Sequence, residues 1–295
     1  MAHTIAYANN KGGVSKTGTM VQTAAALARA GYDVLAIDMD PQANATRRLG
    51  IEWDPENPIA SVSEAIAANE PGAGEGAVIP CGWVGKDGQP TPEAEHIDVL
   101  PARFDLLNRE AEAGTVGAVR RLKKALAGWT VDYDYVLIDT RPDLGHLVQM
   151  AMAAADAVLI PSDPGYDSAE AAIRVADFVT RHADDLGNPS LHVAGIIVTR
   201  KRDTAEAKFQ IEGLEERFGD LVWDLRTTKT IPGDVVVELT PSHIPEWTRF
   251  AEADSMSVSL SDWNDGRGRQ AAALFDEIAR RIVKAFPPAA KEASA

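Results

Sequence analysis

The chain has 295 residues, of which 45% are hydrophobic, so it is long enough to bury a substantial core. Its 44 Asp and Glu outnumber its 29 Lys and Arg, which gives a net charge of −15 at pH 7. This acidity excludes a uniformly basic nucleic-acid coat protein. It does not exclude a local basic patch, because salt confines the reach of each charge to about 10 Å.

The cysteine content and the lengths of the apolar runs indicate the cellular compartment of the protein. A single cysteine, Cys81, excludes an internal disulfide and a four-thiolate zinc site. No apolar run approaches the roughly 20 residues that span a bilayer, and residues 1–8 are too short for a signal peptide. We therefore expect a cytoplasmic protein with no membrane partner.

Short apolar runs alternate with helical segments along the chain. Continuous apolar runs of this kind are typical of parallel strands that are covered on both faces. The expected strands are residues 4–8, 34–37, 135–138, 157–160 and 193–198, and the expected helices are residues 17–30, 61–69, 104–129, 144–155, 168–186, 205–218 and 269–286. The pattern predicts an α/β fold with a doubly wound, mostly parallel sheet and helices on both faces.

Residues 52–98 interrupt this alternation, because they are rich in Gly, Pro and acidic residues. They hold ten acidic residues and Lys86 as their one basic residue, so most of the net negative charge lies there. We interpret them as an irregular acidic insertion in a single domain that spans residues 1–286. Residues 287–295 are expected to form a disordered tail.

A glycine-rich segment stands between the first expected strand and the first expected helix. It reads Asn10-Lys11-Gly12-Gly13-Val14-Ser15-Lys16-Thr17. Glycines let backbone N–H groups surround phosphate oxygens, and the N-terminus of the following helix adds positive potential. The second lysine can neutralise the terminal phosphates, and the threonine hydroxyl can ligate magnesium. The segment therefore predicts a phosphate loop.

The same segment fits the deviant Walker A pattern Lys-Gly-Gly-x-x-Lys-Thr, and here the sequence resembles the ParA/MinD family of dimeric P-loop ATPases. Three further blocks carry the resemblance: residues 38–46, which begin Asp-Met-Asp-Pro-Gln, the strand end at Asp139-Thr140, and residues 160–164. These blocks follow the family order and cover residues 1–200. The resemblance beyond Arg200 is much weaker.

The resemblance implies ATP and Mg²⁺ as cofactors, and a homodimer with nucleotide sandwiched at its interface. It assigns catalysis to Lys11, which reaches across the dimer, to Lys16, and to Asp40, which orients the attacking water. It assigns the metal to Thr17, Asp38 and Asp139. Nucleotide contacts fall on Asn10, Lys11, Gly12, Gly13, Val14, Ser15, Lys16, Thr17, Gly18 and Thr199.

Two positions depart from the commonest family version. Ser15 stands where a glycine is usual, and a side chain there crowds the phosphate loop. Arg141 stands where relatives usually have proline. Two interpretations of Arg141 stay open: contact with phosphate or the dimer partner, or an ion pair with Asp143.

Within the family, one cysteine excludes the nitrogenase iron-protein branch, which needs a pair of cluster cysteines. In the last expected helix an apolar stripe, Leu274, Ile278, Ile282 and Phe286, favours core packing over a MinD-type membrane anchor. The ParA-type partition ATPases remain. This branch implies slow, partner-stimulated ATP hydrolysis, non-specific DNA binding by the ATP-bound dimer, a ParB-like centromere-binding partner, and a nucleoid-associated protein in the cytoplasm. The loop begins at Asn10, so we expect no N-terminal helix-turn-helix.

Non-specific DNA binding requires cations that neutralise phosphates. The candidates are Arg200, Lys201, Arg202, Arg226, Lys229, Arg267 and Arg269. Each cluster fits solvated surface charge equally well. The family resemblance leaves a further alternative for residues 198–200, which could instead border the adenine. If the DNA interpretation holds, the acidic residues 52–98 should lie away from the basic face, where they could attract a basic partner.

Two other functions compete with partition. A ParA-like positioner of a non-DNA cargo would use the same chemistry with a different partner. A P-loop kinase or synthetase acting on a small molecule is the alternative from another class. Lys11 argues against the second alternative, because a lysine suited to reaching across a dimer has no evident role in a monomeric transferase.

Overall fold

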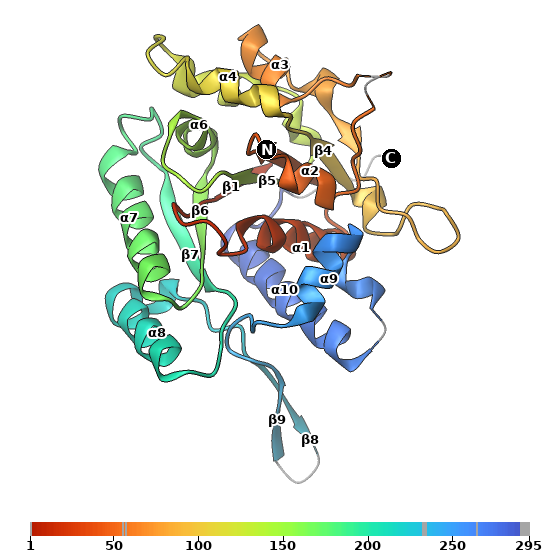
Figure 1. The fold of residues 1–295 in the computed structure, drawn as a ribbon, viewed down its shortest axis with the longest axis vertical. Coiled ribbons are helices and arrows are strands. Elements are labelled where there is room, and N and C mark those ends of the chain that lie inside the picture. Colours follow the sequence, from red (N-terminus) through yellow and green to blue (C-terminus); the bar gives the residue numbers. More distant parts are fainter. Residues whose placement is uncertain (1, 55, 57, 232–234, 264, 290–295) are drawn as a thin grey trace.

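The computed structural model describes residues 2–54, 56, 58–231, 235–263 and 265–289 (Figure 1). Of the tail expected at residues 287–295, positions 290–295 lie outside the described residues. In the described part of the chain, no helix is both long and apolar enough to cross a bilayer.

A seven-stranded sheet forms the centre of the molecule, in the order β3-β4-β2-β5-β1-β6-β7. Its strands are β1 (His3–Tyr7), β2 (Val34–Met39), β3 (Ile79–Pro80), β4 (Ile97–Leu100), β5 (Tyr135–Thr140), β6 (Ala157–Ser162) and β7 (His192–Val198). Every neighbouring pair is parallel except β3 with β4. The mostly parallel, doubly wound α/β fold is confirmed.

Helices cover both faces of this sheet (Figure 1). They are α1 (Lys16–Arg29), α2 (Asn44–Arg48), α3 (Val62–Ala68), α4 (Leu107–Glu110), α5 (Arg121–Ala125), α6 (His146–Ala154), α7 (Tyr166–His182), α8 (Ala205–Phe218), α9 (Thr248–Met256) and α10 (Gly266–Ala285). Buried side chains of α1, α9 and α10 form one hydrophobic cluster, and those of α3, α5, α6, α7 and α8 form the other. Strand residues alternate between the two clusters, as the period of two requires: Val34 joins one and Leu35 the other.

The C-terminal helix α10 packs in the core, as its apolar stripe predicts. Leu274, Ile278 and Ile282 are fully buried in the cluster that also contains α1. The short helix expected at residues 61–69 is confirmed as α3, and Ser61 and Glu64 form a capping box at its start.

The single helix expected at residues 104–129 is wrong. The structure has the short α-helices α4 and α5 there, and 3-10 helices at Phe104–Leu106 and Ala118–Arg120. Gly117 and Gly128 adopt left-handed backbone angles, with φ of 77° and 97°, which a continuous helix does not permit.

Residues 52–98 contribute more to the sheet than their composition suggests. They supply β3 and the first residues of β4, and β4 pairs with β2. Cys81 and Trp83 of this segment are buried, and the Trp83 indole donates a 2.7 Å hydrogen bond to the carbonyl of Arg48. Strand β4 was not predicted, because its four residues include an acidic one.

An antiparallel hairpin, β8 (Thr227–Ile231) with β9 (Val235–Thr240), projects beyond the rest of the molecule (Figure 1). Gln270 of α10 donates a hydrogen bond to the Leu239 carbonyl, which ties the hairpin to α10. Figure 1 draws the hairpin well apart from residues 52–98. The hairpin that carries Lys229 is therefore separate from the acidic segment, as expected.

Candidate nucleotide site

The phosphate loop connects β1 to α1 at the carboxyl edge of the sheet, and neighbouring strands fix its shape. Asn9 donates from its amide to the Pro161 carbonyl at 2.8 Å and accepts from the backbone N–H of Lys11 at 3.0 Å. On the other side, the Thr199 hydroxyl donates to the Val14 carbonyl at 3.0 Å. The loop is therefore held by contacts with β6 and with the residue that follows β7. The role of Asn9 was missed, since nothing in the sequence shows that it meets β6.

Ser15 takes a left-handed conformation, with φ of 58°, immediately before α1. Such a conformation costs a non-glycine residue roughly 1–2 kcal/mol. The Ser15 carbonyl accepts hydrogen bonds from both the backbone N–H and the hydroxyl of Thr19. The surrounding contacts therefore hold a strained residue at the point where the loop enters the helix.

The two loop lysines lie in different surroundings. Lys16 is buried, and its Nζ donates to the Lys11 carbonyl at 3.3 Å. Burial lowers the pKa of Lys16, while the nearby Asp139 and Asp40 oppose that shift. Lys11 is 45% exposed and pairs at 3.3 Å with Asp167 at the start of α7. Thus Lys16 faces inward, and Lys11 lies on the surface.

Asp38 and Asp139 occupy neighbouring strand ends, and both are buried. Asp38 accepts hydrogen bonds from the backbone N–H of Asp40 and from the N–H and hydroxyl of Thr46. Asp139 Oδ2 accepts from the Thr17 hydroxyl at 2.7 Å, whereas its Oδ1 is buried without a hydrogen-bond partner. Desolvation by burial raises the pKa of Asp38 to about 6 and that of Asp139 to about 8.

The unpartnered oxygen of Asp139 fits a magnesium site beside Thr17. In the described residues, no group of three or more His, Cys, Asp or Glu side chains could enclose a metal. Magnesium is usually held by one or two carboxylates together with water and substrate phosphates, so such a cage is unnecessary. The oxygens of Asp38 instead hold the backbone around Asp40 in place.

Asp40 lines a cavity of about 300 Å³ at the phosphate loop. Its Oδ1 accepts a 2.9 Å hydrogen bond from the backbone N–H of Gln42, which fixes the direction of the carboxylate. The cavity is lined by Gly12, Gly13, Ser15, Lys16, Thr17, Asp40, Asn44, Arg48, Thr140, Pro142 and Asp254. A lysine ammonium and a carboxylate thus face the same small volume.

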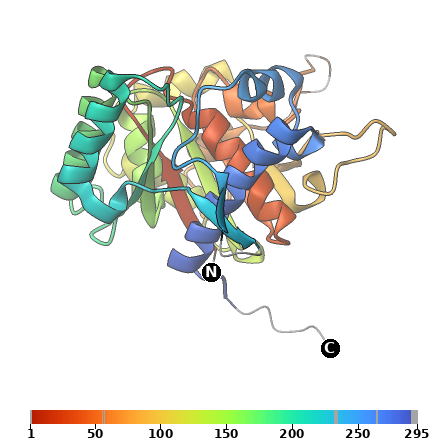
Figure 2. The same cartoon turned by 90° about the horizontal axis from the view of Figure 1, so that it is seen from below.

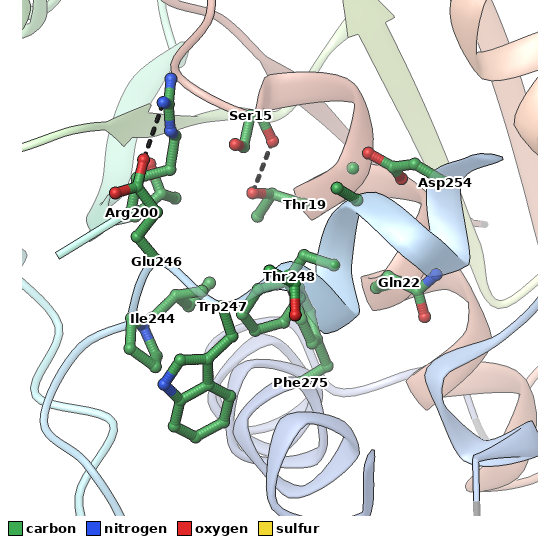
Figure 3. A pocket seen from close by; sticks show the side chains of 15 residues that line it. Ser15, Thr19, Gln22, Arg200, Ile244, Glu246, Trp247, Thr248, Asp254 and Phe275 are labelled. Carbon is green, nitrogen blue, oxygen red and sulfur yellow. Dashed lines mark hydrogen bonds and ion pairs between the residues drawn. The ribbon is translucent and has the colours of Figure 1, made fainter. Parts of the chain in front are cut away.

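A second cavity of about 500 Å³ adjoins the first, and the two share Ser15 and Asp254 (Figure 3). Its apolar wall comes from Ile244, Pro245, Trp247, Phe250 and Phe275, and its polar groups include Thr199, Arg200 and Glu246. An apolar pocket of this size with a few polar groups suits a nucleoside. Most of this wall follows residue 240, beyond the part of the sequence that carries the motifs.

Arg200 lines the second cavity of the candidate nucleotide site. Its Nη1 donates to the Gly13 carbonyl at 2.7 Å, and its Nη2 pairs with Glu246 at 2.9 Å. Arg202 pairs with the same carboxylate. These interactions direct the Arg200 guanidinium toward the phosphate loop, so we do not retain it as a DNA contact.

Arg141 pairs with Asp143 at 2.5 Å and lies 3.7 Å from Glu110. Of the two interpretations left open for Arg141, the ion pair with Asp143 is the one present. His243 is buried beside Ser242, outside both cavities.

Of the remaining expected DNA contacts, Lys201 and Arg202 follow β7 beside Arg200. The other four lie on or next to α10 and the hairpin. Lys229 is exposed on β8, while Arg226 just before it is half exposed and lies near Asp224 and Glu238. Arg267 and Arg269 are exposed at the start of α10, with the Arg267 guanidinium 4.3 Å from the Trp247 ring centroid. Sequence reasoning missed a further basic group toward the end of α10, formed by Arg280, Arg281 and Lys284.

Comparisons with known proteins find relatives that match most of the chain. Residues 2–193 match the family described as AAA domain (AAA_31). The chain is 34% identical over 253 residues to the sporulation initiation inhibitor protein Soj of Bacillus subtilis, covering 82% of this chain and 89% of Soj. It is also 34% identical to the chromosome partitioning protein ParA of Caulobacter vibrioides, covering 81% of this chain and 83% of that protein.

Solved structures support the fold. The complex of ATP with a D38A form of Cyanothece McdA superposes with a TM-score of 0.77 at 20% identity, covering 95% of this chain and 96% of that one. Cobyrinic acid a,c-diamide synthase from Mycobacterium smegmatis, bound to ADP and magnesium, gives a TM-score of 0.68 at 25% identity, covering 99% and 100%.

Proposed function

Because the chain belongs to the ParA/MinD family of P-loop ATPases, we propose that it is a DNA-partition ATPase: ATP drives dimerisation, the dimer binds DNA non-specifically, and a ParB-like partner stimulates slow hydrolysis. The observation that carries the proposal is the arrangement at the phosphate loop. Lys16 is buried near Asp139 and Asp40, and Lys11 is exposed in the same loop.

The two cavities together would hold one ATP. The apolar cavity would take the base, the N–H groups of residues 12–17 would surround the phosphates, and Lys16 would neutralise them. Thr17 and Asp139 would hold Mg²⁺, which supplies positive charge to the phosphates. Asp40 faces the same cavity and would orient the attacking water, while positive charge lowers most of the barrier.

Lys11 supports a dimer with nucleotide at its interface. Its Nζ is held only by a surface ion pair with Asp167 among the contacts described, and such pairs contribute about 0–1 kcal/mol. The ammonium can therefore leave Asp167 at little cost and reach a phosphate of a facing subunit.

The DNA-binding face would be formed by α10 and the hairpin. Arg269 and Arg280 lie about three helical turns apart on α10, and Lys284 follows one turn later, so the three share one side of the helix. Arg281 donates a hydrogen bond to the Asp224 carbonyl, which places the end of α10 beside the segment that holds Arg226. The other expected contacts, Lys201, Arg202, Lys229 and Arg267, would lie around this face.

The distribution of charge would allow partner and DNA to bind together. The acidic residues 52–98 lie apart from the hairpin (Figure 1), so a basic ParB-like segment could approach them without competing with DNA. In a cell, such a protein would be cytoplasmic and associated with the nucleoid.

Two alternatives remain distinguishable. A ParA-like positioner of a non-DNA cargo would keep the same chemistry and differ in its partner. A small-molecule synthetase is suggested by the fold it shares with cobyrinic acid a,c-diamide synthase. The higher identity to Soj and ParA favours partition over both.

The test is DNA binding with ATP, with ADP and without nucleotide over a salt series, for the wild type and Lys16→Ala. We expect salt-sensitive binding with ATP in the wild type alone. The absence of ATP-dependent DNA binding would overturn the partition proposal. ATP consumption that requires a metabolite, without DNA or partner, would point to the synthetase.

A further inference from the structure

A second arginine faces the nucleotide cavities. Arg48 is the last residue of α2, and its side chain lines the phosphate cavity together with Lys16 and Thr17. Its Nη2 pairs at 3.0 Å with Asp254 of α9, and about a quarter of each side chain is exposed. No motif in the sequence predicts this arrangement, because the two residues are about two hundred positions apart.

The ion pair lies where the two cavities meet. Asp254 lines both of them, and Figure 3 shows its carboxylate beside the first turn of α1. A Cβ added at Gly18 would lie 3.4 Å from Arg48 Nη1 and from both carboxylate oxygens of Asp254. The pair therefore covers Gly18, at the point where the phosphate chain would join the nucleoside.

Other contacts hold Arg48 in this position. The Ser257 hydroxyl, just past α9, donates a 2.9 Å hydrogen bond to the Arg47 carbonyl. The Trp83 indole donates to the carbonyl of Arg48 itself. Because α2 is fixed at its end from two sides, the guanidinium needs little reorganisation to meet a ligand.

From this geometry we infer that Arg48, oriented by Asp254, is a phosphate-binding residue that contacts the phosphate nearest the nucleoside. A guanidinium has five N–H donors in a planar fork, so it can bind Asp254 and a phosphate oxygen together. The inference rests on the proposed nucleotide binding. Arg48 would contact the nucleotide whether or not the terminal phosphate is present. The roles proposed for Lys11 and Lys16 involve the terminal phosphates.

The test is calorimetric titration of ADP and of ATP into the wild type, Arg48→Ala, Arg48→Lys and Arg47→Ala. Arg47 is the matched control, because its guanidinium binds the Gln42 carbonyl and Asn44 and does not line the phosphate cavity. We expect Arg48→Ala to weaken both nucleotides by the same factor of about tenfold, the effect of one charge-assisted hydrogen bond. Arg48→Lys should lose less, and Arg47→Ala should match the wild type.

A melting curve for each variant keeps the test independent of folding. If folded Arg48→Ala and Arg48→Lys both bind ADP as tightly as the wild type, the inference is wrong. A loss confined to ATP would also overturn it, because the contact would then involve the terminal phosphate. If the wild type binds neither nucleotide, the proposed function itself fails.

Discussion

Asp38 and Asp139 lie directly opposite each other on β2 and β5, with both carboxyl groups buried and only Asp139 retaining an oxygen without a hydrogen-bond partner. Two buried carboxyl groups side by side resist full ionisation, and a cation relieves that cost. The unpartnered oxygen favours Asp139, beside Thr17, as the proposed magnesium ligand. Both carboxylate oxygens of Asp38 already accept hydrogen bonds from Asp40 and Thr46.

This difference predicts how the two residues respond to magnesium. With ADP present, adding Mg²⁺ should raise the melting temperature of the wild type, and Asp139→Asn should lose that increment while still responding to ADP alone. Asp38→Asn should melt at a lower temperature but keep the magnesium increment, because it loses contacts to Asp40 and Thr46. If Asp38→Asn loses the magnesium increment and Asp139→Asn keeps it, the assignment of the metal to Asp139 is wrong.

Replacing Asp40 should separate binding from turnover. Asp40→Ala removes the carboxylate that faces the phosphate cavity but leaves Lys16 and Thr17 in place. Hydrolysis should fall by at least about 100-fold, the usual contribution of a general base, while ATP-dependent DNA binding persists. Asp220→Ala, an exposed carboxylate outside both cavities, serves as the control. Loss of ATP binding in Asp40→Ala would make Asp40 a structural residue.

The basic face of α10 is open to a salt-series test. The double variant Arg280→Ala/Lys284→Ala should weaken ATP-dependent DNA binding for every sequence tested. The slope of log affinity against log salt should become shallower by about 2, if each residue meets one phosphate of duplex DNA. Arg174→Ala/Arg181→Ala on α7 removes the same charge from other exposed positions and should behave as the wild type. If both double variants lose the same DNA affinity, the loss comes from the change in net charge and not from the face of α10.

His243 should make the stability of the protein fall in acid. Its pKa is lowered from 6.5 to about 4, mainly by burial. The unfolded chain therefore takes up a proton before the folded one, so the contribution of His243 is complete above pH 6.5 and is lost as the pH falls toward 4. Each pH unit in that window removes up to about 1.4 kcal/mol.

The check is the free energy of unfolding from denaturant titrations between pH 7 and pH 4. His243→Asn cannot be protonated and should flatten the decline. His192→Asn, which replaces an exposed histidine, should keep it. A decline of equal size in all three proteins would remove His243 as its cause.

Residue patterns within short segments of the sequence predicted the strand ends and the phosphate loop. The glycines and lysines of residues 11–17 carry their chemistry in a single short segment, and the apolar strands β2, β5 and β6 are continuous runs. Helix α8 was placed with its correct bounds, because Thr204 caps its start and Gly219 follows its end. The roles of Lys11, Asp40 and the metal ligands came from the family resemblance and stay predictions.

Features that depend on distant contacts were not predictable in this way. The wall of the base cavity comes from Ile244, Trp247 and Phe275, which the fold alone brings to the phosphate loop. Asn9 and Thr199 hold that loop through contacts with segments far away in the chain. Arg200 was assigned to DNA from its charge, whereas its position is decided by Glu246 and Gly13.

The first strand and the last helix meet at the amino ends of the strands, whereas the candidate nucleotide site lies at their carboxyl ends. The His3 ring nitrogen lies 2.9 Å from the Pro287 carbonyl oxygen, and the Tyr135 hydroxyl donates to the Phe286 carbonyl. Figure 2 shows the start of the chain beside the end of α10. Fluorescent proteins fused before His3 or after Pro287 would leave from this edge, so the movement of the protein in cells could be followed with the nucleotide site unobstructed.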